Sequence, residues 1–302
     1  MKLALAFPGV GAALTGREAA FLERNKQAAA PLLERASARV GVDLEATLAG
    51  GDLGGLDERT AQVLTYAFSC AVARALRARG HKPVAVAGYS MGLYAALESA
   101  GAVSFDDGMV ITIQAHQVMG RVCGGGGPHG LAVTVGLNEE ELTRLLTRDE
   151  LRGVRLVNLN NSTALVCAGP LAELERLVTL ALEADAIRAS LLPAGLPYHH
   201  PALLAQAPDA FAPFLAQLGW QRPACPVISA VTGEAVSEAE DLRALTANHL
   251  ARPIALPPAL NTLARLGVDA VVECGPGLSL TQSARMVQGA PPFINLKTLQ
   301  RR

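Results

Sequence analysis

Short apolar runs alternate with longer amphipathic stretches along most of the chain. The first run, 3–7, is closed by a glycine-rich turn at 8–11, and another run at 84–87 leads directly into the pentapeptide 88–92. Apolar runs of this length between turn residues are typical of buried strands, whereas the stretch at 16–40 has the spacing of a helix. Strands that alternate with helices predict a parallel sheet covered on both faces.

A second pattern occupies the middle of the chain, after a glycine-rich run at 124–128 that we interpret as a hinge or linker. The residues that follow predict strands and helices in the order β-α-β-β-α-β, at 131–135, 138–147, 154–159, 164–168, 171–184 and 187–193. This order matches the ferredoxin-like motif. We therefore predict an α/β fold in which a large hydrolase-like domain with a parallel sheet, 1–124 and 197–302, carries an inserted ferredoxin-like small domain, 125–196.

The remaining apolar periodicity predicts further elements of the large domain. They are a loop at 50–55, helices at 60–79, 201–218 and 238–250, and strands at 227–229 and 268–273.

Composition narrows the classes of function. Half of the 302 residues are hydrophobic, 18% are charged and the formal net charge is −1, so a large core is available and no basic surface suggests nucleic acid. The five cysteines are scattered and never in Cys-x-x-Cys spacing, which argues against a disulfide framework and a metal site. The first apolar run is too short for a signal peptide, and no stretch is long enough to span a membrane. We expect a cytoplasmic protein without nucleic-acid or membrane partners.

The pentapeptide Gly88-Tyr89-Ser90-Met91-Gly92 has the Gly-x-Ser-x-Gly pattern of a nucleophile elbow. Such a turn, placed between a buried strand and a helix, lifts the serine hydroxyl above the sheet at the helix N-terminus. We therefore predict that Ser90 is a nucleophile. A glycine-rich turn with an incidental serine is the weaker alternative.

A serine hydroxyl needs a neighbouring base to act as a nucleophile. Among the six histidines, His199 and His200 lie together where the chain returns to the large domain, on a predicted loop before Pro201. Loops held by a rigid scaffold commonly carry bases. The alternative is that the pair only caps the helix predicted to begin at Pro201.

An oxyanion hole needs backbone N–H donors, and a residue of any side-chain type can provide one. The amide of Met91, directly after the nucleophile, is the first candidate donor. The amide of Val10, in the turn at the end of a neighbouring strand, is the second.

Six short segments follow one another in a distinctive order. They are Phe-Pro-Gly-Val-Gly at 7–11, Gly-Tyr-Ser-Met-Gly at 88–92, Gly-Ala-Val-Ser-Phe at 101–105, Val-Asn-Leu-Asn-Asn-Ser at 157–162, Pro-Tyr-His-His at 197–200 and Glu-Cys-Gly-Pro-Gly at 273–277. Over nearly the whole chain this series resembles the malonyl-CoA:acyl carrier protein transacylases and related acyltransferase domains.

The resemblance implies that Ser90 takes an acyl group from a coenzyme A thioester and passes it to the phosphopantetheine thiol of an acyl carrier protein, with no permanently bound cofactor. The family's base falls on His199 if Pro-Tyr-His is matched to the family motif, and on His200 if the following helix is aligned instead. We favour His199. The family orients its base with a backbone carbonyl, and the matching position here lies near His249.

One departure from the family bears on the acyl group. Malonyl enzymes of the family place an arginine four residues before a methionine on the helix after the elbow, and counting back from Met119 gives Ala115. An arginine there would pair bidentately with the malonyl carboxylate, which alanine cannot do. Three polar neighbours on the same helix are candidate substitutes, namely Gln114, His116 and Arg121. The short chain, this altered site and the Tyr-Ser-Met elbow look like the transacylase component of bacterial malonate decarboxylase.

Two other functions compete with acyl transfer. A serine esterase or thioesterase of the α/β-hydrolase type needs an acid between Ser90 and the histidine, for which Asp149 and Asp185 are candidates, although both fall in the predicted small domain. A non-catalytic scaffold is favoured only by the missing arginine.

Overall fold

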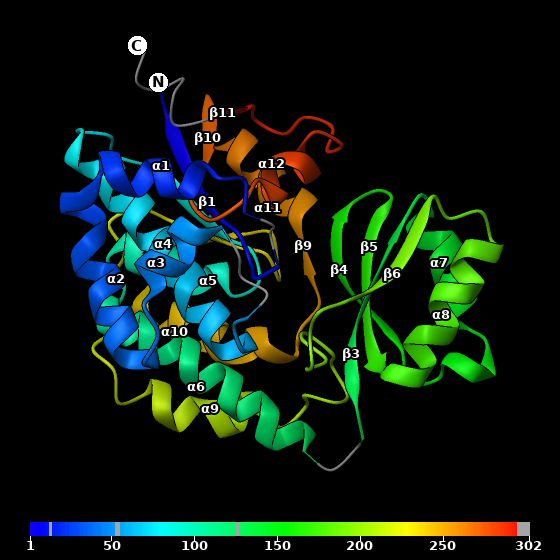
Figure 1. The fold of residues 1–302 in the computed structure, drawn as a ribbon. Helices are drawn as coiled ribbons and strands as arrows, with labels where there is room; N and C mark the ends of the chain where they lie inside the picture. Colours follow the sequence, from blue (N-terminus) through cyan, green and yellow to red (C-terminus); the bar gives the residue numbers. More distant parts are fainter. Residues whose placement is uncertain (12–13, 52–54, 125–126, 295–302) are drawn as a thin grey trace.

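The computed structural model describes residues 1–11, 14–51, 55–124 and 127–294. The loop predicted at 50–55 and the linker predicted at 124–128 therefore lie partly outside the described residues. Within these ranges the chain forms two β-sheets with helices packed against them, as Figure 1 shows. Every described helix is too short or too polar to cross a bilayer.

The larger sheet has the strand order β11-β10-β1-β2-β7-β8, and all neighbours except β7 and β8 are parallel. Its strands are β1 (Leu3–Phe7), β2 (Ala85–Gly88), β7 (Val227–Ser229), β8 (Ala235–Val236), β10 (Ala270–Glu273) and β11 (Phe293–Ile294). The strands predicted at 3–7, 84–87, 227–229 and 268–273 are therefore present. The parallel pairs account for the wholly apolar runs in the sequence, because such strands are buried on both faces.

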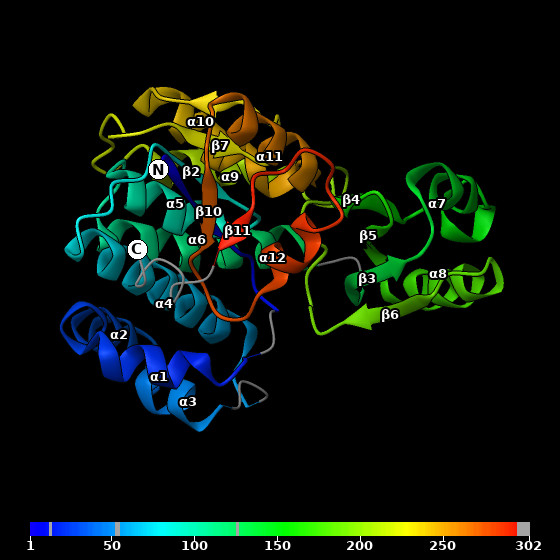
Figure 2. The same ribbon diagram turned by 90° about the horizontal axis from the view of Figure 1, so that it is seen from above.

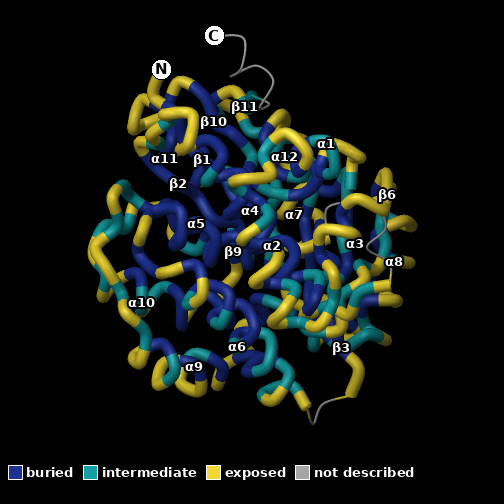
Figure 3. The backbone as a smooth tube through the Cα atoms, turned by 60° about the vertical axis from the view of Figure 1, so that its left-hand side comes forward, coloured by how far each residue is buried: buried dark blue, intermediate teal, exposed yellow. Residues whose placement is uncertain are grey.

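Alternate residues of β1 enter two different cores. Leu5 and Phe7 pack with the helices before β3 and with α9 and α10, whereas Ala4 and Ala6 pack with α11 and α12. The side-chain period of two in a strand produces this division. In Figure 3 the buried backbone is concentrated in β1, β2 and the helix α5 that follows β2.

Ten helices of the described residues surround this sheet. They are α1 (Arg17–Arg24), α2 (Lys26–Val40), α3 (Leu44–Gly50), α4 (Glu58–Ala78), α5 (Gly92–Ala100), α6 (Phe105–Cys123), α9 (Ala207–Leu215), α10 (Ala239–Asn248), α11 (Leu256–Arg265) and α12 (Ser279–Ala284). Figure 2 shows α1, α2 and α3 grouped beside α4 and distant from the smaller sheet.

Three of the predicted helices were wrong in extent. The helix expected at 16–40 is interrupted at Asn25, whose side chain donates a hydrogen bond to the Phe21 carbonyl and ends α1. The helix expected at 201–218 is reduced to α9, because residues 201–206 form turns. The helix expected at 238–250 is divided into α10 and a short 3₁₀ turn, His249–Ala251.

The smaller sheet has the order β6-β3-β5-β4-β9. It contains β3 (His129–Val135), β4 (Arg155–Asn161), β5 (Ala164–Pro170), β6 (Arg188–Leu192) and β9 (Ile254–Ala255), with α7 (Glu139–Leu146) and α8 (Leu171–Glu183) on its outer side, as Figure 1 shows. The predicted β-α-β-β-α-β order is present, and the α/β fold class is confirmed. The sequence did not predict β9, which comes from the C-terminal half and pairs in parallel with β4. The division into two domains at 124/125 and 196/197 stays a prediction.

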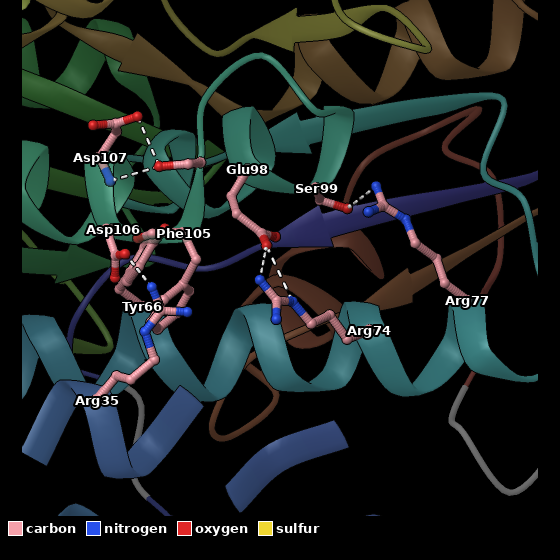
Figure 4. A network of polar contacts seen from close by, with 10 residues as sticks. Arg35, Tyr66, Arg74, Arg77, Glu98, Ser99, Phe105, Asp106 and Asp107 are labelled. Atoms are coloured by element: carbon pink, nitrogen blue, oxygen red, sulfur yellow. Dashed lines mark hydrogen bonds and ion pairs between the residues drawn. The ribbon is translucent and has the colours of Figure 1, made fainter. Parts of the chain in front are cut away.

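Polar contacts join α4 to α5 and α6 behind the larger sheet (Figure 4). Arg74 of α4 donates two hydrogen bonds to the carboxylate of Glu98 at 3.2 and 2.9 Å, and the Tyr66 hydroxyl donates to the Phe105 carbonyl at 2.9 Å. Glu98 is buried near the end of α5, and its carboxylate is paired with Arg74. These contacts fix the helix whose N-terminus follows Ser90.

Replacing Arg74 with methionine tests this pairing. We expect Arg74→Met to lower the free energy of unfolding by about 2 kcal/mol, because it leaves the buried carboxylate of Glu98 without its partner. Urea denaturation measures the change. Arg77→Met on the same helix is the control, since Arg77 makes only a 3.4 Å contact with Ser99. An equal loss in both variants would contradict the assignment.

Candidate active site

Ser90 lies at the sharp turn between β2 and α5. Its φ of 54° is in the left-handed region, which a residue with a Cβ adopts only when its surroundings impose it. A Cβ on Gly88 would overlap the Leu93 backbone, and one on Gly92 would overlap the carbonyl of Phe7. The two glycines of the pentapeptide are therefore required by packing, and the tight turn they permit presents the Ser90 hydroxyl above the sheet.

His199 is the side chain that meets Ser90. Its Nε2 lies 2.8 Å from Ser90 Oγ, and its Nδ1 lies 3.0 Å from the carbonyl oxygen of His249. A carbonyl oxygen can only accept, so Nδ1 carries the ring proton and Nε2 presents its lone pair to the Ser90 hydroxyl. His199 also has a positive φ, 65°, so both residues of the pair stand on strained backbone.

Burial determines the charge of His199. The side chain is 3% exposed, and desolvation lowers its pKa to about 4, opposed by the backbone at His249 and Arg252. At neutral pH the imidazole is therefore uncharged and able to accept a proton. The arrangement can deprotonate a serine hydroxyl, which is the chemistry of nucleophilic acyl transfer.

His200 points to different partners. Its Nε2 lies 3.0 Å from the Gly153 carbonyl, and its Nδ1 accepts from the amides of Ala202 and Leu203 at 3.2 and 3.0 Å. Both ring nitrogens are thus occupied. The first contact attaches the segment after His199 to Gly153, which lies just before β4. The other two are those of a residue that caps the following turn, the alternative role predicted for this histidine.

The two predicted oxyanion donors lie beside Ser90. The Tyr89 amide donates to the Phe7 carbonyl at 2.9 Å, so the turn 8–11 begins next to the elbow. A Cβ on Gly9 would lie 3.1 Å from Ser90 Cβ, which shows how closely this turn approaches the nucleophile. Val10 and Met91 both line the cavity in front of Ser90. Their role as amide donors stays a prediction.

That cavity has a volume of about 240 Å³ and lies between the two sheets. One wall is apolar and comes from the smaller sheet, through Leu131, Val166 and Leu192. Polar side chains complete the lining, including Tyr89, whose hydroxyl donates to Asn160 at 2.6 Å, and Gln62, which donates to the Tyr198 hydroxyl at 2.7 Å.

Most of these polar residues were missed by sequence reasoning. Gln62 lies inside a helical stretch with nothing local to distinguish it from its neighbours. Asn160 belongs to the segment 157–162, which carried part of the family resemblance and was the one available signal. Tyr198 was noticed only as the neighbour of His199.

The three predicted substrate-binding residues are not among the cavity-lining residues. Gln114 is half-buried and Arg121 is exposed, both on α6. His116 approaches the cavity only through Glu58, a lining residue whose Oε2 lies 3.8 Å from the His116 Nε2. Ala115 is buried at 1% exposure. A part for these side chains in substrate binding therefore stays a prediction without support from the geometry.

Within the described ranges, the side chains form neither a metal-binding cluster nor a disulfide bond. There, no three histidine, cysteine, aspartate or glutamate side chains are placed to hold a metal ion. All five cysteines are free thiols.

Comparison with known proteins agrees with this geometry. The protein-family model described as the acyl transferase domain matches residues 6–288 of this chain. The polyketide biosynthesis protein ThaF of Burkholderia thailandensis is 32% identical over 68% of this chain, which spans only 17% of that longer protein. The malonyl CoA-acyl carrier protein transacylase of Escherichia coli K12 is 30% identical, over 93% of this chain and 91% of the relative.

A solved structure extends the comparison. A malonyl-transacylase in complex with its type II polyketide synthase acyl-carrier protein superposes with a TM-score of 0.86 and 26% identity. The match covers 98% of this chain and 96% of the other.

Serine-reactive labelling distinguishes the two histidines. We expect His199→Ala to slow reaction of Ser90 with an alkyl fluorophosphonate roughly 100-fold or more, because the general base is lost. His200→Ala is the matched control and should retain most of the rate, since its ring contacts only Gly153, Ala202 and Leu203. Mass spectrometry of the Ser90 peptide measures both rates. A slow His200→Ala variant beside a fast His199→Ala variant would reverse the assignment.

Proposed function

The chain belongs to the acyl transferase domain family, and from this premise we propose that it moves a malonyl group from coenzyme A to an acyl carrier protein through an ester on Ser90. The observation that carries the proposal is the 2.8 Å contact between Ser90 Oγ and His199 Nε2, with His199 Nδ1 held by the His249 carbonyl. This arrangement supplies a nucleophile and a neutral base inside a cavity between two sheets.

In the first half-reaction, Ser90 Oγ attacks the thioester carbonyl carbon of malonyl-CoA while its proton passes to His199 Nε2. The carbonyl oxygen becomes an oxyanion, for which the amides of Val10 and Met91 are the proposed donors. Collapse of the tetrahedral intermediate breaks the carbon–sulfur bond. The coenzyme A sulfur leaves with the proton held by His199, and the malonyl group remains on Ser90.

The second half-reaction reverses these roles. The phosphopantetheine thiol of the carrier protein gives its proton to His199 and attacks the Ser90 ester. The ester bond to Oγ breaks, Ser90 recovers the proton, and the malonyl group leaves as a new thioester. The apolar wall formed by Leu131, Val166 and Leu192 limits access of water to the ester, which favours transfer over hydrolysis.

The names of two similar proteins support malonyl-CoA as the acyl donor and an acyl carrier protein as the acyl acceptor. The Escherichia coli relative is a malonyl CoA-acyl carrier protein transacylase, and the solved neighbour is bound to an acyl-carrier protein. Each step above uses groups of this chain, and coenzyme A takes part as a thioester substrate. Membership of the malonate decarboxylase branch and a cytoplasmic location are finer proposals, the first resting on Ala115 and the Tyr-Ser-Met elbow.

The geometry disfavours the esterase alternative. A hydrolase triad needs an acid at His199 Nδ1, but that nitrogen is bonded to the His249 carbonyl. The candidate acids lie elsewhere: Asp149 accepts from Arg152, and Asp185 follows α8 with a φ of 63°. The contact between Ser90 and His199 likewise disfavours a non-catalytic scaffold.

A transfer assay tests the proposal directly. With radiolabelled malonyl-CoA we expect label to move to the holo form of an acyl carrier protein by ping-pong kinetics, and not to its apo form, which lacks the thiol. Ser90→Ala should abolish transfer, because no acyl-enzyme can form. Release of free malonate without labelled carrier protein would indicate a hydrolase, and no turnover of malonyl-CoA by the wild type would overturn the proposal.

A further inference from the structure

A buried polar ring without a partner belongs to a residue in the wall of the cavity beside Ser90. The His249 side chain is 4% exposed, and among the described residues neither Nδ1 nor Nε2 has a hydrogen-bond partner. Buried polar groups in native proteins are nearly always satisfied, so an unsatisfied pair at a cavity wall calls for a ligand or water. His249 lines the same cavity as Ser90 and His199.

The ring is held in place by aromatic neighbours and not by hydrogen bonds. Its centroid lies 4.9 Å from that of His199 at an interplanar angle of 78°, and 6.0 Å from that of Tyr94 at 76°. The Ser90 backbone is close enough to oppose the lowering of the His249 pKa, although neither ring nitrogen reaches hydrogen-bond geometry with it. The ring therefore lies beside the backbone of the residue that would carry the acyl group.

The rest of the described lining offers no cation to a carboxylate. It contains no lysine or arginine, and Ala115 occupies the place where the family resemblance puts an arginine. The one carboxylate in the lining is Glu58, which accepts from the Gly195 amide and lies near His116. A free carboxylate on the acyl group would thus need a donor other than a guanidinium.

We propose that the imidazole of His249 donates a hydrogen bond to the free carboxylate of the malonyl group carried by Ser90, and so selects this acyl group over an uncharged one. The inference rests on the proposed function. A neutral imidazole has one N–H donor, and hydrogen bonds to an ionised acceptor are stronger than those between neutral groups. Burial first, and then the neighbouring His199, lower the pKa of His249 to about 3, so the ring is neutral at neutral pH.

The side chain and the backbone of His249 have separate roles. The backbone carbonyl orients His199 in every variant of the residue, because a substitution leaves it in place. Removing the ring nitrogens should therefore change which acyl group is loaded and leave the base intact.

Acyl selectivity of the full chain tests the proposal. The rate constant kcat/KM for loading Ser90 is measured separately with malonyl-CoA and acetyl-CoA by mass spectrometry. We expect His249→Leu and His249→Phe to lower the malonyl-to-acetyl ratio by roughly tenfold or more, the loss of one hydrogen bond to a charged group. His249→Gln retains an N–H donor and should keep a larger part of the ratio.

Controls separate selectivity from folding and from the function itself. His129→Leu removes another buried histidine, on β3, and should leave the ratio unchanged. The Phe variant keeps an aromatic ring beside His199 and Tyr94, so it reports on the nitrogens if the Leu variant does not fold. Equal losses for both thioesters, or an unchanged ratio, would show that His249 only packs. A wild type that loads neither thioester would overturn the proposed function itself.

Discussion

The imidazole of His199, held between the Ser90 hydroxyl and the His249 carbonyl, is the interaction on which the rest of the site depends. It joins three segments that are far apart in the sequence, and both Ser90 and His199 occupy left-handed backbone. Such conformations cost about 1–3 kcal/mol each and persist only where the surrounding structure imposes them. The architecture can therefore be understood as the support for two strained residues that must meet.

Each side of this contact is supported by a different sheet. On the larger sheet, β1 and β2 pair up to Phe7 and Gly88, and the glycines of the elbow let α5 approach the strand ends. The histidine side is joined to the smaller sheet. The segment after His249 continues into β9, which pairs with Asn158 and Leu159 of β4, while His200 bonds to Gly153 just before the same strand. The cavity consequently forms where the two sheets are tied together.

Local patterns predicted much of this structure, and long-range ones did not. The strands β1 and β2, the elbow and the β-α-β-β-α-β order were all readable, because each depends on apolar periodicity and turn residues close in sequence. The strand β9 has only two residues and pairs with β4, a distant segment, so the local sequence pattern could not predict it. The family motif favoured His199 over His200, but only the structure shows which ring contacts Ser90: His199 has a positive φ and its Nε2 lies 2.8 Å from the hydroxyl oxygen. Candidates for the carboxylate were sought next to Ala115 along α6, but consecutive residues of a helix do not share a face.

The His249 carbonyl fixes the tautomer of His199, and burial keeps the ring neutral. Proton–nitrogen correlation NMR of histidine-labelled protein tests it most directly, with His199→Ala to assign the signal. We expect a ring that is protonated only at Nδ1 at neutral pH and takes up a second proton when the pH falls to about 4. A proton on Nε2, or a charged imidazolium at neutral pH, would contradict it.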